Sequence, residues 1–570
     1  MLKGTNASAG IGIGKAVIVE ETELNIQKVT IEDSEAEKIR FQEAVKQAME
    51  EIGALAKDLA AKVGEKEAEI LNGHLLLLSD PMLTGEIENA IAVDHMNSEF
   101  AVETVCNTYA DMFSSMGDEL MQQRATDMRD IKTRIQKILL NVKSVDIASL
   151  PKGSIIISKD LTPSMTAGIN PDHVTGIVTE LGGKTSHSAI LARALEIPAV
   201  VAIKGIMDQV KDGMNFVLDG SDGTVIVDPS EDVLADYTLK RDQFMKEKKE
   251  LEQYIGKPTI TKDGVSIELV ANIGKPEDVE KVLHYDGEGI GLFRTEFLFM
   301  DRTSMPTEEE QFESYRKVAT AMNGKPVIIR TLDIGGDKEI PYMGLEKDEN
   351  PFLGYRAIRF CLDRKEDVYK PQLRALLRAS AFGDIRIMVP LVTCLEEIRE
   401  AKDLIEEIKK ELDETGVAYK KEIQVGIMVE TAAASLMADV FAKEVDFFSI
   451  GTNDLTQYTM SVDRGNEKIS YLYSPLNPAV LRSIRYIIEC GRKEGIMVGM
   501  CGEAASDPLL IPLLLAFGLN EFSMSASAIL NARKLIMGYD TSELQAMAQE
   551  AMSFATAKEV EAYMKEFISR

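Results

Sequence analysis

From Val265 onward, short apolar runs alternate with segments in which apolar residues recur every three or four positions. The short runs have the length and β-branched content of buried strands, and the periodic segments are typical of amphipathic helices. Strands are predicted at 265–271, 289–293, 327–329, 385–389, 425–429, 447–450, 496–500 and 521–524. Eight strands that alternate with helices predict a (β/α)8 TIM barrel for this part of the chain.

The first 228 residues show a different pattern, in which short β-rich runs flank a long helical stretch. Strands are predicted at 10–20, 153–158, 173–179, 199–203 and 216–227. Between the first two of them, residues 33–142 carry apolar positions three and four apart, which predicts a helical bundle. Gly10-Ile-Gly-Ile-Gly14 is interpreted as a loop, because neither a helix nor the acidic partner of a dinucleotide fold follows it.

These patterns predict a multidomain α/β protein with four parts. Residues 1–30 and 144–228 form a small α/β domain, and 31–143 form a helical bundle inserted into it. Residues 229–260 form a charged helical linker, and 261–570 form the barrel. A length of 570 residues agrees with several domains of roughly 150 residues each.

Charge and composition exclude several classes of protein. The chain has 64 Lys and Arg against 93 Asp and Glu, a net charge of −29, which disfavours nonspecific binding to nucleic acid or anionic lipid. The apolar run 509–519 is shorter than the ~20 residues that span a bilayer. The five cysteines lack C-x-x-C spacing, and the N-terminal sequence does not resemble a secretion signal, so a cytoplasmic location without membrane insertion is expected.

The predicted helical bundle is itself acidic. Residues 31–143 contain 12 basic and 22 acidic residues, a net charge of −10. This charge suits a basic protein partner, although a solvated helical surface is the preferred explanation if the charge is considered alone.

The segment Leu181-Gly-Gly-Lys-Thr-Ser-His187 places a histidine near the start of a predicted helix. Free backbone N–H groups and the positive end of the helix dipole would stabilise a phosphate carried on that imidazole. The alternative is a histidine that caps or packs the helix. Val178 stands where a P-loop requires glycine, so a Walker A site is excluded.

Several arginines follow predicted barrel strands or lie in the loops beyond them. A guanidinium binds phosphate or carboxylate through two parallel hydrogen bonds, so arginines at one barrel mouth suggest a small polyanionic substrate. The alternative is ion pairing with Glu296 or Asp333. The candidate residues are Arg294, Arg330, Arg356 and Arg464.

Two carboxylates and a thiol complete the predicted barrel mouth. Glu430 and Asp454 end consecutive strands and can converge on one Mg²⁺, or each can cap the next helix. Cys501 lies at the mouth of the seventh strand, between Gly499 and Gly502. A thiol there could donate a proton to a carbon atom of the substrate, and the alternative is an inert cysteine of the core.

Five motifs together resemble the enzyme I family of the bacterial phosphoenolpyruvate-dependent sugar phosphotransferase system. The resemblance runs from end to end. The histidine domain is expected to begin at residue 1, whereas pyruvate phosphate dikinase and phosphoenolpyruvate synthase carry an ATP-binding domain before it. The motifs are Gly182-Gly-Lys-Thr-Ser-His187, Gly289-Ile-Gly-Leu-Phe-Arg-Thr-Glu-Phe-Leu-Phe-Met300, Asn350-Pro-Phe-Leu-Gly-Tyr-Arg-Ala-Ile-Arg359, Gly451-Thr-Asn-Asp-Leu-Thr-Gln-Tyr458 and Gly499-Met-Cys-Gly-Glu503.

The resemblance implies that His187 takes the phosphoryl group of phosphoenolpyruvate, releases pyruvate, and passes the group to a histidine of the phosphocarrier HPr. It implies that Cys501 protonates the enolate, that Thr166 contacts His187, and that HPr docks on residues 31–143. A homodimer through the barrel is also implied. The implied substrate ligands are Arg294, Arg330, Arg356, Asn453 and Arg464, and the implied ligands of Mg²⁺, or alternatively Mn²⁺, are Glu430 and Asp454.

The chain departs from the family pattern at Ala432, Ala504 and Ser506, which lie beside the predicted site. Two other functions stay open from the sequence. One is a phosphoenolpyruvate-using lyase or synthase that does not need HPr, and the other is a regulatory binding module with an inactive barrel.

Overall fold

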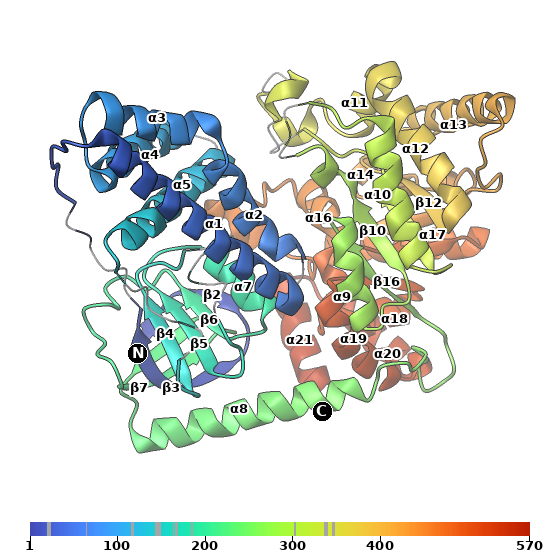
Figure 1. Ribbon diagram of the computed structural model, residues 1–570. Helices are drawn as coiled ribbons and strands as arrows, with labels where there is room; N and C mark the ends of the chain where they lie inside the picture. Colours follow the sequence, from blue (N-terminus) through green and yellow to red (C-terminus); the bar gives the residue numbers. More distant parts are fainter. Residues whose placement is uncertain are drawn as a thin grey trace. The chain divides into compact units, whose positions relative to one another are not determined.

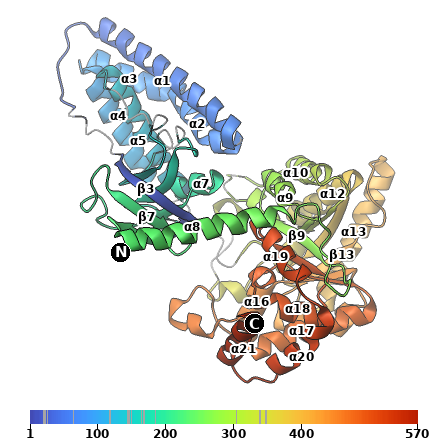
Figure 2. The same cartoon turned by 90° about the horizontal axis from the view of Figure 1, so that it is seen from below.

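A computed structural model of the chain describes residues 1–19, 24, 26–63, 65–115, 119–142, 147, 150–162, 165, 169–183, 186–300, 302, 304–335, 340–344 and 348–569. The chain forms two compact units, Met1–Lys248 and Lys249–Arg570 (Figures 1 and 2). Among the residues just given, no helix is long and apolar enough to cross a membrane.

The first unit contains a mixed sheet whose strands lie in the order β1-β8-β7-β3-β4-β5-β6-β2. Strands β3 to β6 are parallel, whereas β7, β8, β1 and β2 pair antiparallel with their neighbours. The strands are β1 (Leu2–Lys3), β2 (Thr5–Ser8), β3 (Ile11–Ile18), β4 (Ser154–Ser158), β5 (Val174–Thr179), β6 (Ala199–Val201), β7 (Asn215–Asp219) and β8 (Thr224–Val227).

The strand predicted at 10–20 is present as β3, and the interpretation of the Gly10–Gly14 motif within it as a loop is wrong, because most of the motif lies in β3. A Cβ added at Gly12 would lie 2.4 Å from the carbonyl oxygen of Thr175. At Gly14 it would lie 2.0 Å from the carbonyl oxygen of Gly153. The glycines therefore allow β3 to approach neighbouring backbone more closely than any side chain permits.

Helices α1 to α5 form the predicted bundle, and their buried apolar faces share one core with the sheet. That core joins bundle residues such as Phe41, Ile91 and Ile131 to Ile156 and Val201 of the sheet. The helices of this unit are α1 (Ser34–Val63), α2 (Glu65–Leu78), α3 (Pro81–Val93), α4 (Ser98–Ser115), α5 (Glu119–Leu139), α7 (His187–Ala194) and α8 (Glu231–Glu252), of which α8 continues into the second unit.

The second unit is a closed barrel of parallel strands, which confirms the predicted fold class. Its strands lie in the order β10-β11-β12-β13-β14-β15-β16-β9, so the first strand closes against the last. They are β9 (Glu268–Ile273), β10 (Ile290–Arg294), β11 (Pro326–Arg330), β12 (Asp384–Val389), β13 (Val425–Val429), β14 (Phe447–Ile450), β15 (Met497–Met500) and β16 (Glu521–Met524).

Helices surround this barrel and bury a continuous apolar layer against its outer face. Their starts carry local signals: Thr307 and Glu310 form a capping box for α10, and Asn477 caps α17, which begins with Pro478. The helices are α9 (Val279–His284), α10 (Glu308–Ala321), α11 (Ile358–Asp363), α12 (Lys370–Ala379), α13 (Leu395–Thr415), α14 (Ala432–Leu436), α15 (Ala438–Phe441), α16 (Thr452–Met460), α17 (Pro478–Glu494), α18 (Ile511–Phe517), α19 (Ile529–Met537), α20 (Thr541–Ala551) and α21 (Ala557–Ser569).

Candidate active site

The predicted barrel residues gather at the carboxyl end of the strands. Arg294 and Arg330 are the last residues of β10 and β11, and Glu430 and Cys501 directly follow β13 and β15. Asn453 and Asp454 lie in the first turn of α16, just beyond β14. Parallel strands of a barrel end on one face, so these side chains share the mouth at which barrel enzymes build their active sites.

Arg330 is almost fully buried and is held by two carboxylates. Its Nη2 lies 2.7 Å from Glu296 Oε1, and its Nη1 lies 3.0 Å from Asp333 Oδ2. Burial lowers the pKa of Arg330, but the negative charges of Glu296 and Asp333 outweigh that effect and raise it above the ordinary value. The guanidinium is therefore permanently charged and fixed in direction.

Arg356, from the loop before α11, shares an ion-pair partner with Arg330. Its Nη2 lies 2.8 Å from Asp333 Oδ1 and 3.5 Å from Asp454 Oδ2, and its Nη1 donates to the hydroxyl of Tyr458 at 3.4 Å. Asp333 thus bridges the two buried guanidiniums, one with each oxygen. The predicted alternative of ion pairing therefore applies to both arginines, and it orients them at the mouth.

Two further arginines are exposed. Arg464 Nη1 lies 3.4 Å from Asp454 Oδ1, and its backbone N–H donates to the side chain of Gln457 at 3.0 Å. The guanidinium of Arg294 lies over the ring of Phe297, 5.0 Å from its centroid. Exposed guanidiniums can change rotamer to reach an anion, whereas the buried pair cannot.

Glu430 is buried at the centre of this charged group. Its Oε1 accepts a hydrogen bond from the backbone N–H of Leu391 at 2.7 Å. Burial, followed by the negative charges of Asp454 and Asp333, raises the pKa of Glu430 to about 8. Three carboxylates therefore lie close enough to repel one another, although Arg330 offsets part of that repulsion.

Asn453 helps to hold the loop that follows β15. Its Oδ1 accepts from the backbone N–H of Glu503 at 3.2 Å, and its carbonyl oxygen accepts from the hydroxyl of Tyr473 at 3.2 Å. Cys501, in the same loop, is buried, with Sγ 3.8 Å from the carbonyl oxygen of Ile450. Burial raises the pKa of the Cys501 thiol to about 12, so it stays protonated near neutral pH.

The predicted histidine belongs to the other unit. His187 is the first residue of α7, and Ser186 caps that helix by accepting from the backbone N–H of Ala189 at 3.4 Å. Gly182 has a φ of 100°, a conformation that favours glycine, and it turns the chain from β5 towards α7. The His187 side chain and the whole of Thr166 lie outside the described residues.

The structure adds residues to the mouth for which the sequence predicts no specific role. Asp333 is predicted only as an ion-pair partner, and Tyr458 has no predicted role although it lies in one of the quoted motifs. Asn272 is predicted to follow a strand on the active-site face, without a role of its own, and it lies near the end of β9. A carboxylate three residues after a strand-end arginine, as in Arg330 and Asp333, is a local signal that could have been used.

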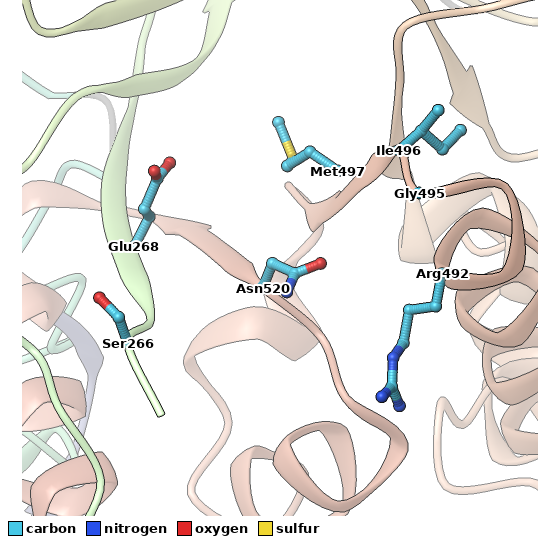
Figure 3. A pocket seen from close by; sticks show the side chains of 7 residues that line it. All are labelled: Ser266, Glu268, Arg492, Gly495, Ile496, Met497 and Asn520. Atoms are coloured by element: carbon cyan, nitrogen blue, oxygen red, sulfur yellow. The ribbon is translucent and has the colours of Figure 1, made fainter. Parts of the chain in front are cut away.

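A cavity of about 500 Å³ lies elsewhere, at the amino end of the barrel (Figure 3). Its lining includes Glu268, the first residue of β9, and Met497, the first residue of β15. In Figure 3 Glu268 and Arg492 lie on opposite sides of the cavity. This cavity therefore belongs to the end of the strands opposite the charged mouth.

Three family models match most of the chain and fall in both units. The family model for "PEP-utilising enzyme, PEP-binding domain" matches residues 248–541, "PEP-utilising enzyme, N-terminal" matches 3–124, and "PEP-utilising enzyme, mobile domain" matches 150–223.

Curated relatives named phosphoenolpyruvate-protein phosphotransferase match over almost their full length. The protein from Bacillus subtilis (strain 168) is 48% identical over 99% of both chains. That from Geobacillus stearothermophilus is 48% identical over 100% of this chain and 98% of its own. That from Staphylococcus carnosus (strain TM300) is 47% identical over 99% of both chains. The chain therefore belongs to the phosphoenolpyruvate-protein phosphotransferase family.

Proposed function

We propose that this protein transfers the phosphoryl group of phosphoenolpyruvate to its own His187, releases pyruvate, and passes the group to a histidine of the phosphocarrier HPr. The predicted activity class, a phosphotransferase, agrees with its family. The observation that carries the proposal is the chain of buried charges from Arg330 through Asp333 to Arg356 and Asp454. Phosphoryl transfer depends mainly on positioning and on neutralising charge, which such a group supplies.

The substrate carries a phosphate and a carboxylate, so it needs several cations in fixed directions. Arg330 and Arg356 keep their orientation because Asp333 holds both of them. The Nε atoms of these two arginines are buried without a hydrogen-bond partner among the described residues. We assign substrate binding to these two guanidiniums, to the exposed side chains of Arg294 and Arg464, and to the amide of Asn453.

Glu430 and Asp454 fit a divalent cation. Both are buried, and their mutual repulsion contributes to the raised pKa of Glu430. Asp454 Oδ1 accepts no hydrogen bond within the described part of the chain, although Arg464 Nη1 lies 3.4 Å away. Mg²⁺ commonly takes one or two protein carboxylates and completes its shell with water and phosphate oxygens. When bound, Mg²⁺, or Mn²⁺ in its place, supplies positive charge to the phosphate.

In the proposed reaction, the imidazole of His187 attacks phosphorus, and the bond from phosphorus to the enol oxygen breaks. The backbone N–H groups in the first turn of α7 then stabilise the phosphate on the ring. The enolate of pyruvate takes a proton on carbon from the neutral thiol of Cys501, and the thiolate regains a proton from solvent. Thr166 is proposed to contact the histidine.

The remaining proposals concern partners and motion. HPr is proposed to dock on the acidic bundle at 31–143, and a homodimer to form through the barrel domain at 261–570. One histidine serves both phosphoenolpyruvate and HPr, so the domain formed by 1–30 and 144–228 must move about the linker at 229–260. A cytoplasmic location, without nucleic acid or membrane insertion, suits this function.

Incubation with phosphoenolpyruvate labelled with ³²P tests the proposal. We expect acid-labile label on His187, its transfer to purified HPr, and its complete loss in His187→Ala with an unchanged thermal unfolding profile. Label on another residue of that variant would contradict the assignment. Pyruvate release without any transfer to HPr would favour the lyase or synthase alternative. The absence of label from the unchanged protein would favour a regulatory module with an inactive barrel, and unchanged labelling of Arg294→Ala would contradict the role of Arg294 in substrate binding.

A further inference from the structure

The side chain of Asn272 connects the first strand of the barrel to the residue proposed as proton donor. Asn272 lies near the end of β9, and its Nδ2 donates to the carbonyl oxygen of Cys501 at 3.0 Å. These residues are 229 positions apart in the chain. Since β16 lies between β9 and β15, the amide spans the closure of the barrel at its active-site end.

The orientation of this amide is fixed by Ser523 of β16, which is fully buried. The Ser523 hydroxyl donates to Asn272 Oδ1 at 2.5 Å, and Asn272 Nδ2 lies 3.5 Å from the Ser523 carbonyl oxygen. Carbonyl oxygens only accept hydrogen bonds, so the amide nitrogen must face both of them. A Cβ at Gly291 of β10 would lie 2.5 Å from Ser523 Oγ, so a glycine there leaves room for the hydroxyl.

We infer that Asn272, clamped by Ser523, is a positioning residue that sets the direction of the Cys501 thiol. The inference rests on the proposed role of Cys501 as proton donor. The backbone N–H of Cys501 donates to the carbonyl oxygen of Ile450 at 3.1 Å, and Asn272 holds the carbonyl on the other side of the same residue. With both peptide groups held, the Cα–Cβ bond of Cys501 points in one direction.

This direction matters because the enolate of pyruvate has two faces at its terminal carbon. When the S–H bond breaks, its proton adds to that carbon, the electron pair stays on sulfur, and the thiolate later takes a proton from solvent. A thiol that lies on one side delivers its proton to one face. If the thiol is displaced, water competes for the enolate and reaches both faces.

The handedness of the product tests the inference. Phosphoenolpyruvate labelled stereospecifically at C3 with deuterium and tritium gives pyruvate with a chiral methyl group when protonation is one-sided. We expect a single handedness from the unchanged protein and a nearly racemic methyl group from Asn272→Ala. A positioned acid contributes about 10²- to 10⁴-fold, so we expect kcat to fall roughly tenfold while KM for phosphoenolpyruvate changes less than about twofold.

Matched variants separate positioning from folding. Asn272→Asp keeps the size of the side chain but places a carboxylate oxygen against the two carbonyl oxygens. Its product should therefore be nearly racemic, as for Asn272→Ala. Ser523→Ala should cause a smaller loss in the same direction. Asn531→Ala, an exposed asparagine of α19, should change neither handedness nor kcat. An unchanged KM also verifies that the barrel mouth of each variant is folded.

Two outcomes distinguish the inference from the proposed function. If Cys501→Ala still gives one handedness, the proton donor is another group and the proposed role of Cys501 fails. If Cys501→Ala gives a racemic product but Asn272→Ala keeps both handedness and kcat, only the positioning role of Asn272 is overturned. Should Asn272→Ala fail to fold, Asn272→Asp and Ser523→Ala decide between these results.

Discussion

Replacing Glu521 by glutamine should remove a pH dependence from the stability of the barrel. Glu521 begins β16, is fully buried, and has no hydrogen bond to either carboxylate oxygen among the described residues. A Cβ at Gly499 would lie 2.4 Å from Glu521 Oε1. Burial raises the pKa of Glu521 to about 8; Glu268, its partner in β9, also raises it, and Arg386 of β12 lowers it.

The sign and size of the effect follow from this pKa. A carboxyl whose pKa rises on folding stabilises the fold fully below its unfolded pKa of 4.5, and this stability is lost as pH rises through about 8. One pKa unit corresponds to about 1.4 kcal/mol. Stability falls only until the pH reaches the folded pKa of about 8, so raising the pH from 6 to 9 lowers the free energy of unfolding by about 3 kcal/mol. Glutamine carries no charge at any pH, so the variant does not lose this stability as the pH rises.

Calorimetry of the full-length protein between pH 6 and pH 9 measures this difference. We expect the unfolding temperature of the barrel in Glu521→Gln to rise relative to the unchanged protein by roughly 5 °C across that range. All other titrating groups are common to both proteins, so they cancel. Glu494→Gln, at an exposed carboxylate ending α17, should give the same difference at every pH. A Glu521→Gln difference independent of pH would refute the reasoning.

Three further predictions concern the barrel mouth. Asp333→Asn leaves the two buried guanidiniums without their shared carboxylate, so barrel stability in urea should fall by about 3 to 5 kcal/mol; a loss below 1 kcal/mol would contradict the bridging role. Tyr458→Phe removes the hydroxyl that joins the Phe352 carbonyl oxygen, at 2.5 Å, to Arg356. Steady-state kinetics should show the KM for phosphoenolpyruvate raised a few-fold with kcat preserved, and a fall in kcat alone would argue against a role of this hydroxyl in binding. Glu430→Gln should raise the Mg²⁺ concentration for half-maximal activity about tenfold or more after chelator treatment, and an unchanged value would exclude it as a ligand.

The barrel elements were predictable because each leaves a local pattern. The predicted ranges of β13, β14 and β16 agree with the structure at both ends. All three are buried along their whole length, and β13 is a short run without a polar side chain, whereas β14 and β16 include Ser449, Glu521 and Ser523. In the first unit, β1 and β2 were not predicted, because runs of two and four residues are too short to show a period. The glycines of β3 imitated a loop, because close backbone contact has no periodic signature.

The shared position of the predicted barrel residues could also be predicted, because a parallel barrel brings the carboxyl ends of its strands to one face wherever they stand in the chain. Which of those residues form hydrogen bonds and ion pairs with one another could not be predicted. Arg356 meets Asp333 across 23 residues and Asp454 across 98, and Asn272 meets Cys501 across the closure of the barrel.

Strand and helix identity depends on backbone hydrogen bonding and side-chain periodicity within a few neighbours, so one-dimensional order is enough to predict it. Which charges become buried, which carboxylate they share and which amide holds a thiol depend on distant segments meeting in a closed sheet. Those contacts arise only when burial removes water from all of the partners together, and that requires the whole barrel.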